Sequence, residues 1–279
     1  MKIITQEHIH AFRAYLFREE KAPATLEKYV HDVTAFMEWC AGKELTKELV
    51  LEYKQLLTER YAPASVNTQI ASLNGFFALF ERYDLRMKAL KIQRQIFARC
   101  ERELTRHEYE RLLCAAQEKN KMRLYYLMQT VCATGIRISE LKAVTVEAVK
   151  RGQASINCKG KMRIVLLPKK LCQMLLGYVR RAGIAAGPVF VSKNGVPLDR
   201  SNIWAEMKKL CAIAGVEAGK VFPHNLRHLF ARTYYKIQKD IVRLADILGH
   251  SSVNTTRIYT METGDVHRRQ LQELGLLRC

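Results

Sequence analysis

The feature that most limits the possible folds is a helical spacing of apolar residues that recurs along most of the 279-residue chain. Apolar side chains three and four positions apart line one face of an α-helix, whereas strict alternation indicates a strand. The spacing predicts four helices in the first part of the chain. They run from Thr5 to about Phe17 and through "APATLEKYVHDVTAFMEWC", "LTKELVLEYKQLLTER" and "APASVNTQIASLNGFFALFERY".

The second and fourth of these segments share the start Ala-Pro-Ala followed by a hydroxyl residue, Thr25 or Ser65. Proline suits the first turn of a helix, and a hydroxyl there can cap the free backbone amides. Helix starts of this kind also suit phosphate, because free N–H groups and the helix dipole point outward. Ordinary capping explains the same residues without a ligand, so the pattern alone does not indicate one.

A second domain is predicted after a charged stretch without strong periodicity. Residues 86–103 are interpreted as the linker, and Thr105 and Glu108 form a capping box at the next helix. Alternation occurs at 154–158, followed by "KGK" and "RIVLLP", which predicts a β-hairpin with Lys159 at its tip. Helices are expected at "RLYYLMQTVCATG", "RISELKAV", "LCQMLLGYVRRAG", "NIWAEMKKLCAIAG", "HNLRHLFARTYYK" and "DIVRLADILG", the last ending at a C-cap glycine, Gly249.

The charge is concentrated in this second part. Lys and Arg number 46 against 27 Asp and Glu, a net charge of +19. Residues 1–95 hold 14 basic and 12 acidic side chains, and residues 96–279 hold 32 and 15. Basic residues alternate with apolar and aromatic ones, as in "RHLFARTYYK", which favours a folded surface for nucleic acid over a merely solvated face. No secretory signal or membrane span is recognisable, and the eight cysteines form no CxxC pair, so a cytoplasmic protein with reduced thiols is expected.

Four separated stretches carry side chains suited to phosphate chemistry. "ATGIRISEL" holds Arg137 and Glu140, the hairpin tip holds Lys159, "HNLRH" holds His224 and Arg227, and "LGHSSVNTTRIYT" holds His250 and Tyr259. Each alone is commonplace, as a surface ion pair, a turn lysine or a core tyrosine. Together they suit an in-line attack by a tyrosine on a phosphodiester.

The physical roles follow from the residue types. Two guanidiniums can clamp the non-bridging oxygens in bidentate fashion, and His250 can complete the cradle. His224 can accept the phenol proton, while Lys159 can protonate the departing 5′ oxygen. No clustered carboxylates for Mg²⁺ and no phosphate loop for ATP are recognisable, so no metal or cofactor is expected.

The stretches "ATGIRISEL", "KGKMRIVLLP", "PHNLRHLFA" and "LGHSSVNTTRIYT" resemble the catalytic boxes of the tyrosine recombinases, the phage integrase and Xer family, from about Leu104 to Thr260. The helices before residue 85 resemble that family's core-binding domain. The resemblance implies that Arg137, Lys159, His224, Arg227, His250 and the nucleophile Tyr259 are catalytic, with Glu140 in support. The hairpin loop looks one residue shorter than usual, so Lys161 stays an alternative acid.

The implied fold is mainly α with a small β-hairpin, in two domains that clamp DNA. A SAM-like helical core-binding domain spans residues 1–85, and a mixed α/β catalytic domain with a C-terminal tail helix spans 104–279. The DNA-binding residues expected from the resemblance are Thr25, Lys28, Tyr29, Ser65, Asn67, Arg163 and Arg257.

The implied function is site-specific recombination of duplex DNA with inverted-repeat core sites, in a bacterium, phage or mobile element. Four protomers would act through a 3′-phosphotyrosyl bond and a Holliday junction, for integration, excision, inversion or dimer resolution. The tail leucines at 271, 274, 276 and 277 predict docking into a neighbouring protomer, or packing on their own domain. A type IB topoisomerase and a catalytically idle DNA-binding regulator are the alternatives, and the need for an accessory protein stays open.

Overall fold

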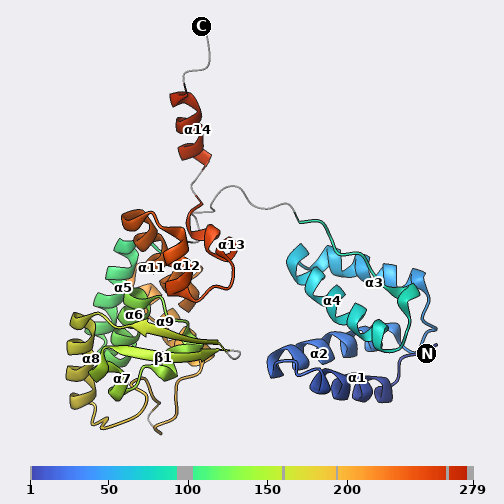
Figure 1. Cartoon of the computed structure of the whole chain (residues 1–279), viewed down its shortest axis with the longest axis horizontal. Helices are drawn as coiled ribbons and strands as arrows, with labels where there is room; N and C mark the ends of the chain where they lie inside the picture. Colours follow the sequence, from blue (N-terminus) through green and yellow to red (C-terminus); the bar gives the residue numbers. More distant parts are fainter. Residues whose placement is uncertain (1, 93–102, 159–160, 193, 262–263, 275–279) are drawn as a thin grey trace. The chain divides into compact units, whose positions relative to one another are not determined.

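The computed structural model describes residues 2–92, 103–158, 161–192, 194–261 and 264–274. The chain divides into two compact units, Met1–Arg94 and Gln95–Cys279. Each unit has its own hydrophobic core. Figure 1 shows helices as the main element of both.

The amino-terminal unit contains the four predicted helices. They are α1 (Gln6–Arg18), α2 (Pro23–Cys40), α3 (Lys47–Arg60) and α4 (Pro63–Leu79), followed by the short 3-10 helix η1 (Tyr83–Leu85). The phenylalanine side chains at 12, 36, 76 and 77 are fully buried and form the centre of its core. The apolar spacing therefore predicted both the helices and their inward faces.

The predicted hydroxyl caps of α2 and α4 are wrong. The N-cap residues are Ala22 and Ala62, and neither helix has a side-chain cap hydrogen bond. Proline occupies the first turn, as expected, but Thr25 and Ser65 lie too far into that turn to cap it. The starts of these helices consequently rely on proline rather than on a hydroxyl.

Polar side chains fix the amino-terminal unit and the segment that leaves it. The buried carboxylate of Asp32 accepts hydrogen bonds from Ser72 Oγ (2.8 Å) and Lys28 Nζ, which ties α2 to α4. Asn67 and Asn74 on α4 bond to the backbone of Leu90 and Met87. Residues 87–90, within the predicted linker, are thus held against α4. Residues 93–102 of that linker lie outside the described residues.

The second unit is built mainly from helices. They are α5 (Arg106–Glu118), α6 (Met122–Thr134), η3 (Ile138–Ala143), α7 (Val146–Arg151), α8 (Lys169–Arg181), α9 (Arg200–Lys208), α10 (Cys211–Ala214), α11 (Pro223–Gln238), α12 (Ile241–Leu248), α13 (Val253–Thr256), η4 (Arg257–Tyr259) and α14 (Gly264–Glu273). The predicted capping box at Thr105 and the C-cap at Gly249 are both present.

The predicted β-hairpin is confirmed. Strands β1 (Gln153–Cys158) and β2 (Lys161–Leu166) pair antiparallel, with Gln153 opposite Leu166 and Cys158 opposite Lys161. In Figure 1 the hairpin lies below α11–α13, with α7 beneath it and α8 at its left. The hairpin tip, residues 159–160, lies outside the described residues. The position of the hairpin places one of its strands beside α12, where the site described below is formed.

One predicted helix differs in kind. The stretch "RISELKAV" forms the 3-10 helix η3 instead of an α-helix. Its start is held by hydrogen bonds between Arg137 and Glu140, and its end by the hydrogen bond from Val189 N to Val144 O. These hydrogen bonds hold both ends of a segment only a few residues long, and 3-10 helices are usually short.

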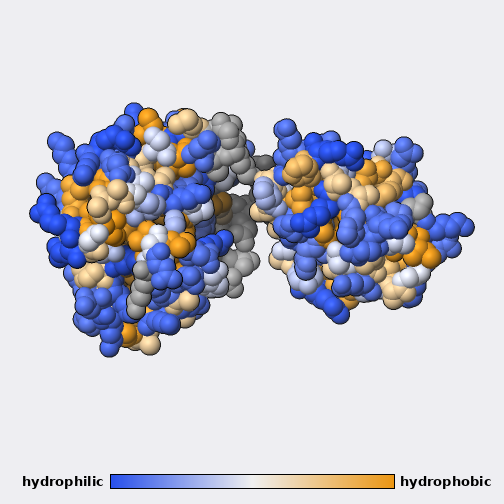
Figure 2. All heavy atoms as spheres, turned by 90° about the horizontal axis from the view of Figure 1, so that it is seen from below, coloured by the Kyte–Doolittle hydropathy of each residue, from blue (hydrophilic) through white to orange (hydrophobic). Residues whose placement is uncertain are grey.

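The fold-class prediction, mainly α with a small β-hairpin, is confirmed among the described residues. Figure 2 shows a mainly hydrophilic surface on which hydrophobic residues occur in small groups. No described helix combines the length and the apolar character that a membrane crossing requires.

Candidate active site

The site is built around the buried guanidinium of Arg227 on α11, which is 2% exposed. Its amino groups donate hydrogen bonds to the carbonyls of Gly135 and Leu248 (2.7 Å for Leu248). Gly135 is the C-cap of α6, and Leu248 is the last residue of α12. Helix C-termini present free carbonyls and the negative end of the helix dipole, so they stabilise a buried cation.

His250 is oriented by two hydrogen-bonding partners. Its Nε2 lies 3.0 Å from an amino group of Arg227, and its Nδ1 lies 2.8 Å from the hydroxyl of the buried Thr256. Arg227 can only donate, so Nε2 accepts, and in the neutral ring the proton resides on Nδ1. The tautomer of His250 is therefore set by its neighbours.

Tyr259 on η4 is 3% exposed and lies among these side chains. Its ring packs edge-to-face on His228, with centroids 4.7 Å apart, and nearly parallel to His250, at 6.1 Å. His228 in turn lies 4.7 Å from the ring of His224, one helical turn earlier on α11. Tyr259 also interacts with the Arg227 guanidinium through charge and hydrogen bonding. The tyrosine, the histidines and Arg227 thus form one cluster within a single chain.

Glu140 holds the second arginine of the site. This buried carboxylate accepts hydrogen bonds from Arg137 through both its backbone amide and its guanidinium (2.9 Å each) and from Arg163 on β2 (2.6 Å). Burial opposes ionisation of Glu140, but the Arg137 amide bond and the Arg163 charge hold its pKa below the usual range. Glu140 is therefore ionised and bridges two guanidiniums.

Concentrated positive charge and burial shift the titration of these groups. Burial, followed by repulsion from Arg137, lowers the pKa of Arg227 to about 10. Burial and the neighbouring arginines or His224 lower the pKa of His228 and of His250 to about 4 in each case. Loss of hydration and the charge of Arg227 also lower the pKa of His224. At neutral pH the imidazoles are uncharged, and the guanidiniums supply the positive charge.

A cleft of about 260 Å³ opens beside the cluster. It is lined by Ile136, Arg137, Ile138, Ser139, Arg200, Pro223, His224 and Arg227. The guanidiniums in its lining can form bidentate hydrogen bonds with an oxyanion, and phosphate oxygens match their planar fork. The lining of the cleft therefore fits a phosphate group.

Most of the residues predicted to be catalytic lie together. Arg137, His224, Arg227, His250 and Tyr259 share this region with Glu140. Lys159 lies outside the described residues. The backbone of Lys161 begins β2, and its side chain is not described. Within the described ranges, no group of three or more His, Cys, Asp or Glu side chains is arranged to hold a metal ion.

The residues predicted to bind DNA have varied surroundings. In the amino-terminal unit, Thr25 and Ser65 lie in the first turns of α2 and α4, and Tyr29 packs partly on the core. Lys28 forms an ion pair with Asp32, and Asn67 forms a hydrogen bond with the Leu90 backbone. In the second unit, Arg257 is exposed and Arg163 forms an ion pair with Glu140. The structure leaves their contact with DNA untested.

Sequence reasoning missed His228, Arg200 and Thr256. His228 follows His224 by four residues, so their shared helical face was readable from the spacing. Arg200 and Thr256 carried no comparable signal, because both reach the site through the folding of the whole unit.

Comparisons with known proteins agree with this geometry. Residues 102–264 match the phage integrase family. The chain is 32% identical to tyrosine recombinase XerA of Thermococcus kodakarensis, over 97% of this chain and 96% of that protein. It is 26% identical to tyrosine recombinase XerD of Vibrio cholerae, over 88% of this chain and 87% of that one.

Solved structures share the fold. The crystal structure of XerA recombinase matches with a TM-score of 0.53 and 27% identity, over 99% of this chain and 100% of that one. A lambda integrase (75–356) dimer bound to a COC′ core site matches with a TM-score of 0.75 and 18% identity, over 95% and 97%. The fold and the site thus define a DNA strand transferase of the tyrosine type. The chain belongs to the phage integrase family and is a site-specific tyrosine recombinase, as the sequence predicted.

The turn at Gly135 gives a test of the packing around Arg227. Gly135 has φ +64°, and an added Cβ would lie under 3.0 Å from the ring of Phe230 and from Leu248. Gly183 has a similar φ of +68° with nothing within 4 Å. In both alanine variants the new side chain is strained by the left-handed backbone, but in Gly135→Ala it also overlaps Phe230 and Leu248. We expect urea unfolding to show that Gly135→Ala lowers the free energy of unfolding by about 1–3 kcal/mol more than Gly183→Ala does. Equal losses in the two variants would contradict this packing.

The histidine pKa values predict a dependence of stability on pH. His228 and His250 have pKa values of about 4 in the folded protein, whereas an unfolded histidine has about 6.5. The unfolded state therefore binds more protons between these values, and stability falls as pH drops through that window. We expect the urea midpoint of unfolding to be lower at pH 5 than at pH 7. In His228→Gln the midpoint should fall less between these pH values than it does in wild type. His107→Gln, an exposed histidine on α5, is the control and should retain the wild-type drop.

Proposed function

We propose that Tyr259 cleaves one strand of duplex DNA by in-line attack on a phosphodiester. The bond from its phenolic oxygen to phosphorus forms as the bond to the 5′ oxygen breaks, which leaves a 3′-phosphotyrosyl linkage and a free 5′-hydroxyl. One observation carries the proposal: the tyrosine lies in the same cluster as Arg227, His228 and His250 of its own chain. Because the linkage conserves the energy of the phosphodiester, a second 5′-hydroxyl can reverse the step without ATP.

The surrounding residues have complementary roles in this proposal. Arg137 and Arg227 bind the non-bridging oxygens, where charge accumulates in the transition state. His250, bonded to Arg227, completes the cradle. His224, a neutral imidazole at neutral pH, accepts the phenol proton, and Lys159 or Lys161 donates a proton to the departing oxygen. Glu140 holds Arg137 in place.

The buried position of the nucleophile adds a step before attack. With only 3% of Tyr259 exposed, the phenol has to rotate, or η4 has to shift, before its oxygen reaches a bound phosphate. Such a movement opens the contact with His228 and His250. DNA binding is therefore proposed to release the tyrosine from its contacts with these histidines.

Duplex DNA with inverted-repeat core sites is the proposed substrate, and four copies are proposed to act together. A likeness to lambda integrase supports this assembly, because one such structure is a tetramer bound to a Holliday junction. The excess of 32 basic over 15 acidic residues in 96–279 supports contact with the phosphate backbone. Strand exchange through a Holliday junction then serves integration, excision, inversion or dimer resolution, with or without an accessory protein.

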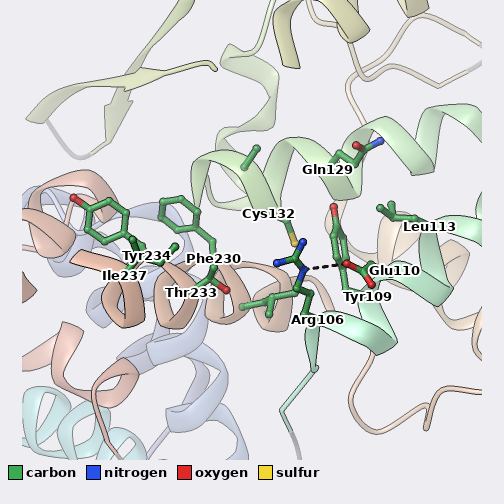
Figure 3. Close-up of a pocket in the computed structure, with 12 residues that line it drawn as sticks. Arg106, Tyr109, Glu110, Leu113, Gln129, Cys132, Phe230, Thr233, Tyr234 and Ile237 are labelled. Carbon is green, nitrogen blue, oxygen red and sulfur yellow. Dashed lines mark hydrogen bonds and ion pairs between the residues drawn. The ribbon is translucent and has the colours of Figure 1, made fainter. Parts of the chain in front are cut away.

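The C-terminal tail is proposed to link the copies. Leu271 on α14 is 68% exposed, and Leu274, directly after the end of α14, is 59% exposed. A groove of about 470 Å³ between α5, α6 and α11 offers an apolar acceptor, shown in Figure 3. Its lining includes Leu113, Cys132, Ala133, Leu229, Phe230 and Ile237. We assign the tail of a neighbouring copy to this groove.

The nucleophile is tested with a nicked suicide substrate that traps the covalent intermediate. Wild-type protein is expected to give a DNA adduct that survives SDS. Tyr259→Phe should bind the same DNA within about twofold, because the phosphate contacts come from the arginines, but give no adduct. An adduct with the phenylalanine variant would show that another residue attacks.

The tail is tested by deleting residues 264–279 and, separately, by Ile237→Asp on the rim of the groove. Both changes are expected to reduce synapsis and recombination between two sites, because each removes one side of an apolar contact. Binding of a single protomer to a half-site should be unchanged. Val196→Asp, at another exposed apolar position (60%, against 70% for Ile237), is the control. Unchanged recombination in both test variants would mean that the tail packs on its own unit.

A further inference from the structure

Arg163 on β2 is held inside the protein instead of pointing to solvent. Its side chain is 15% exposed. One amino group donates to Glu140 Oε2 and the other to the carbonyl of Ile247, both at 2.6 Å. Its Nε is buried and has no hydrogen-bond partner among the described residues. Of the described arginines, Arg137 and Arg227 line the cleft beside the cluster, whereas Arg163 does not, so Arg163 is less well placed than they are to contact a phosphate there.

One acceptor of Arg163 is shared with Arg137, and the other is next to the carbonyls that accept from Arg227 and Arg137. Three successive carbonyls at the end of α12 lie close to three different guanidiniums: Ile247 O to Arg163 (2.6 Å), Leu248 O to Arg227 (2.7 Å) and Gly249 O to Arg137 (3.5 Å). Glu140 joins Arg163 and Arg137 a second time. Arg163 thus contacts the same short turn and the same carboxylate that hold the two proposed phosphate ligands.

The turn itself is shaped to receive this side chain. Gly249 has φ +63°, and a Cβ there would lie 2.5 Å from Cδ of Arg163. The absence of a side chain at Gly249 lets the Arg163 stem pass across the turn, and the left-handed conformation ends α12. Arg163 and Gly249 are therefore matched in shape as well as in hydrogen bonding.

We propose that Arg163 is a positioning residue for strand cleavage: it braces Glu140 and the 247–249 turn, and through them fixes Arg137 and Arg227 against the scissile phosphate. The proposal rests on the cleavage chemistry proposed above. It assigns Arg163 no contact with DNA, in contrast to the role predicted from the sequence.

Geometry explains why an arginine is needed. Its planar fork spans two acceptors on different elements, Glu140 on η3 and Ile247 on α12. A lysine has one ammonium group and cannot reproduce both bonds in these directions. Without Arg163, the Ile247 carbonyl loses this bond, and among the described residues Arg137 is left as the partner of the Glu140 carboxylate. A displacement of about 1 Å in a reacting group can cost on the order of a hundredfold in rate.

The test separates cleavage from binding in the full-length protein. Arg163→Met and Arg163→Lys are compared with wild type for the first-order rate of adduct formation on a saturating suicide substrate, and for DNA affinity. Arg180→Met, which removes an exposed arginine on α8, is the charge control. We expect both Arg163 variants to slow cleavage by about 10- to 100-fold, with affinity within about threefold of wild type. The control should change neither quantity.

Two further measurements identify the route of the effect. If Arg163 acts partly through Glu140, then Arg163→Met in a Glu140→Gln background should cost less than it does in wild type. A substrate with sulfur in place of the 5′ oxygen needs no proton on its leaving group. Arg163→Met should stay slow on this substrate, because its defect lies in phosphate positioning. Recovery of the rate would instead place Arg163 with the leaving-group acid and overturn the proposal.

Other outcomes are equally distinct. Weaker binding, with a salt dependence reduced by about one phosphate contact and an unchanged saturated rate, would make Arg163 a DNA ligand. Gly249→Ala, which displaces the Arg163 stem without removing charge, should slow cleavage even if Arg163→Met folds poorly; Gly183→Ala controls for the backbone strain. Wild-type activity in Gly249→Ala would contradict the bracing role. A wild-type protein that forms no adduct would refute the cleavage chemistry itself.

Discussion

A buried guanidinium organises the catalytic unit. Two helices end beside Arg227 and direct free carbonyls at it, which helps to keep this buried guanidinium charged. These carbonyls are free because α6 and α12 stop at this point. Each helix ends at its own glycine in the left-handed conformation, Gly135 and Gly249. Arg137, which lines the cleft, follows the end of α6, and His250, which bonds to Arg227, follows the end of α12. The arrangement of the site therefore follows from the solvation of one charge.

The parts of the fold that were predictable are those set by local sequence. Three-and-four spacing located the helices, alternation located the hairpin, and the capping box at Thr105 located the start of α5. The errors are also local: a proline in the first turn left Thr25 and Ser65 too far along to cap their helices. Spacing alone likewise did not reveal that the anchors of η3 favour a 3-10 turn.

The site was only partly predictable, for a different reason. The short motifs named Arg137, His224, Arg227, His250 and Tyr259, because each motif carries its chemistry within a few residues. The surroundings of these residues depend on contacts far apart in sequence. Arg163 meets a carbonyl 84 positions away, and Arg227 meets one 92 positions away. The prediction that Arg163 binds DNA is untested, and nothing local in the sequence indicated that its partners are Glu140 and the Ile247 carbonyl.

The charge balance of the site links its resting state to its substrate. Burial, followed by the charges of Arg227, Arg137 and Arg163, lowers the pKa of His250 to about 4. A bound phosphodiester would bring negative charge among these arginines and offset their repulsion, which shifts the pKa of His250 upward. A protonated Nε2 can then donate to the phosphate, in place of the bond that it accepts from Arg227. The positive charges of these arginines would therefore be partly balanced by a phosphate of the bound DNA.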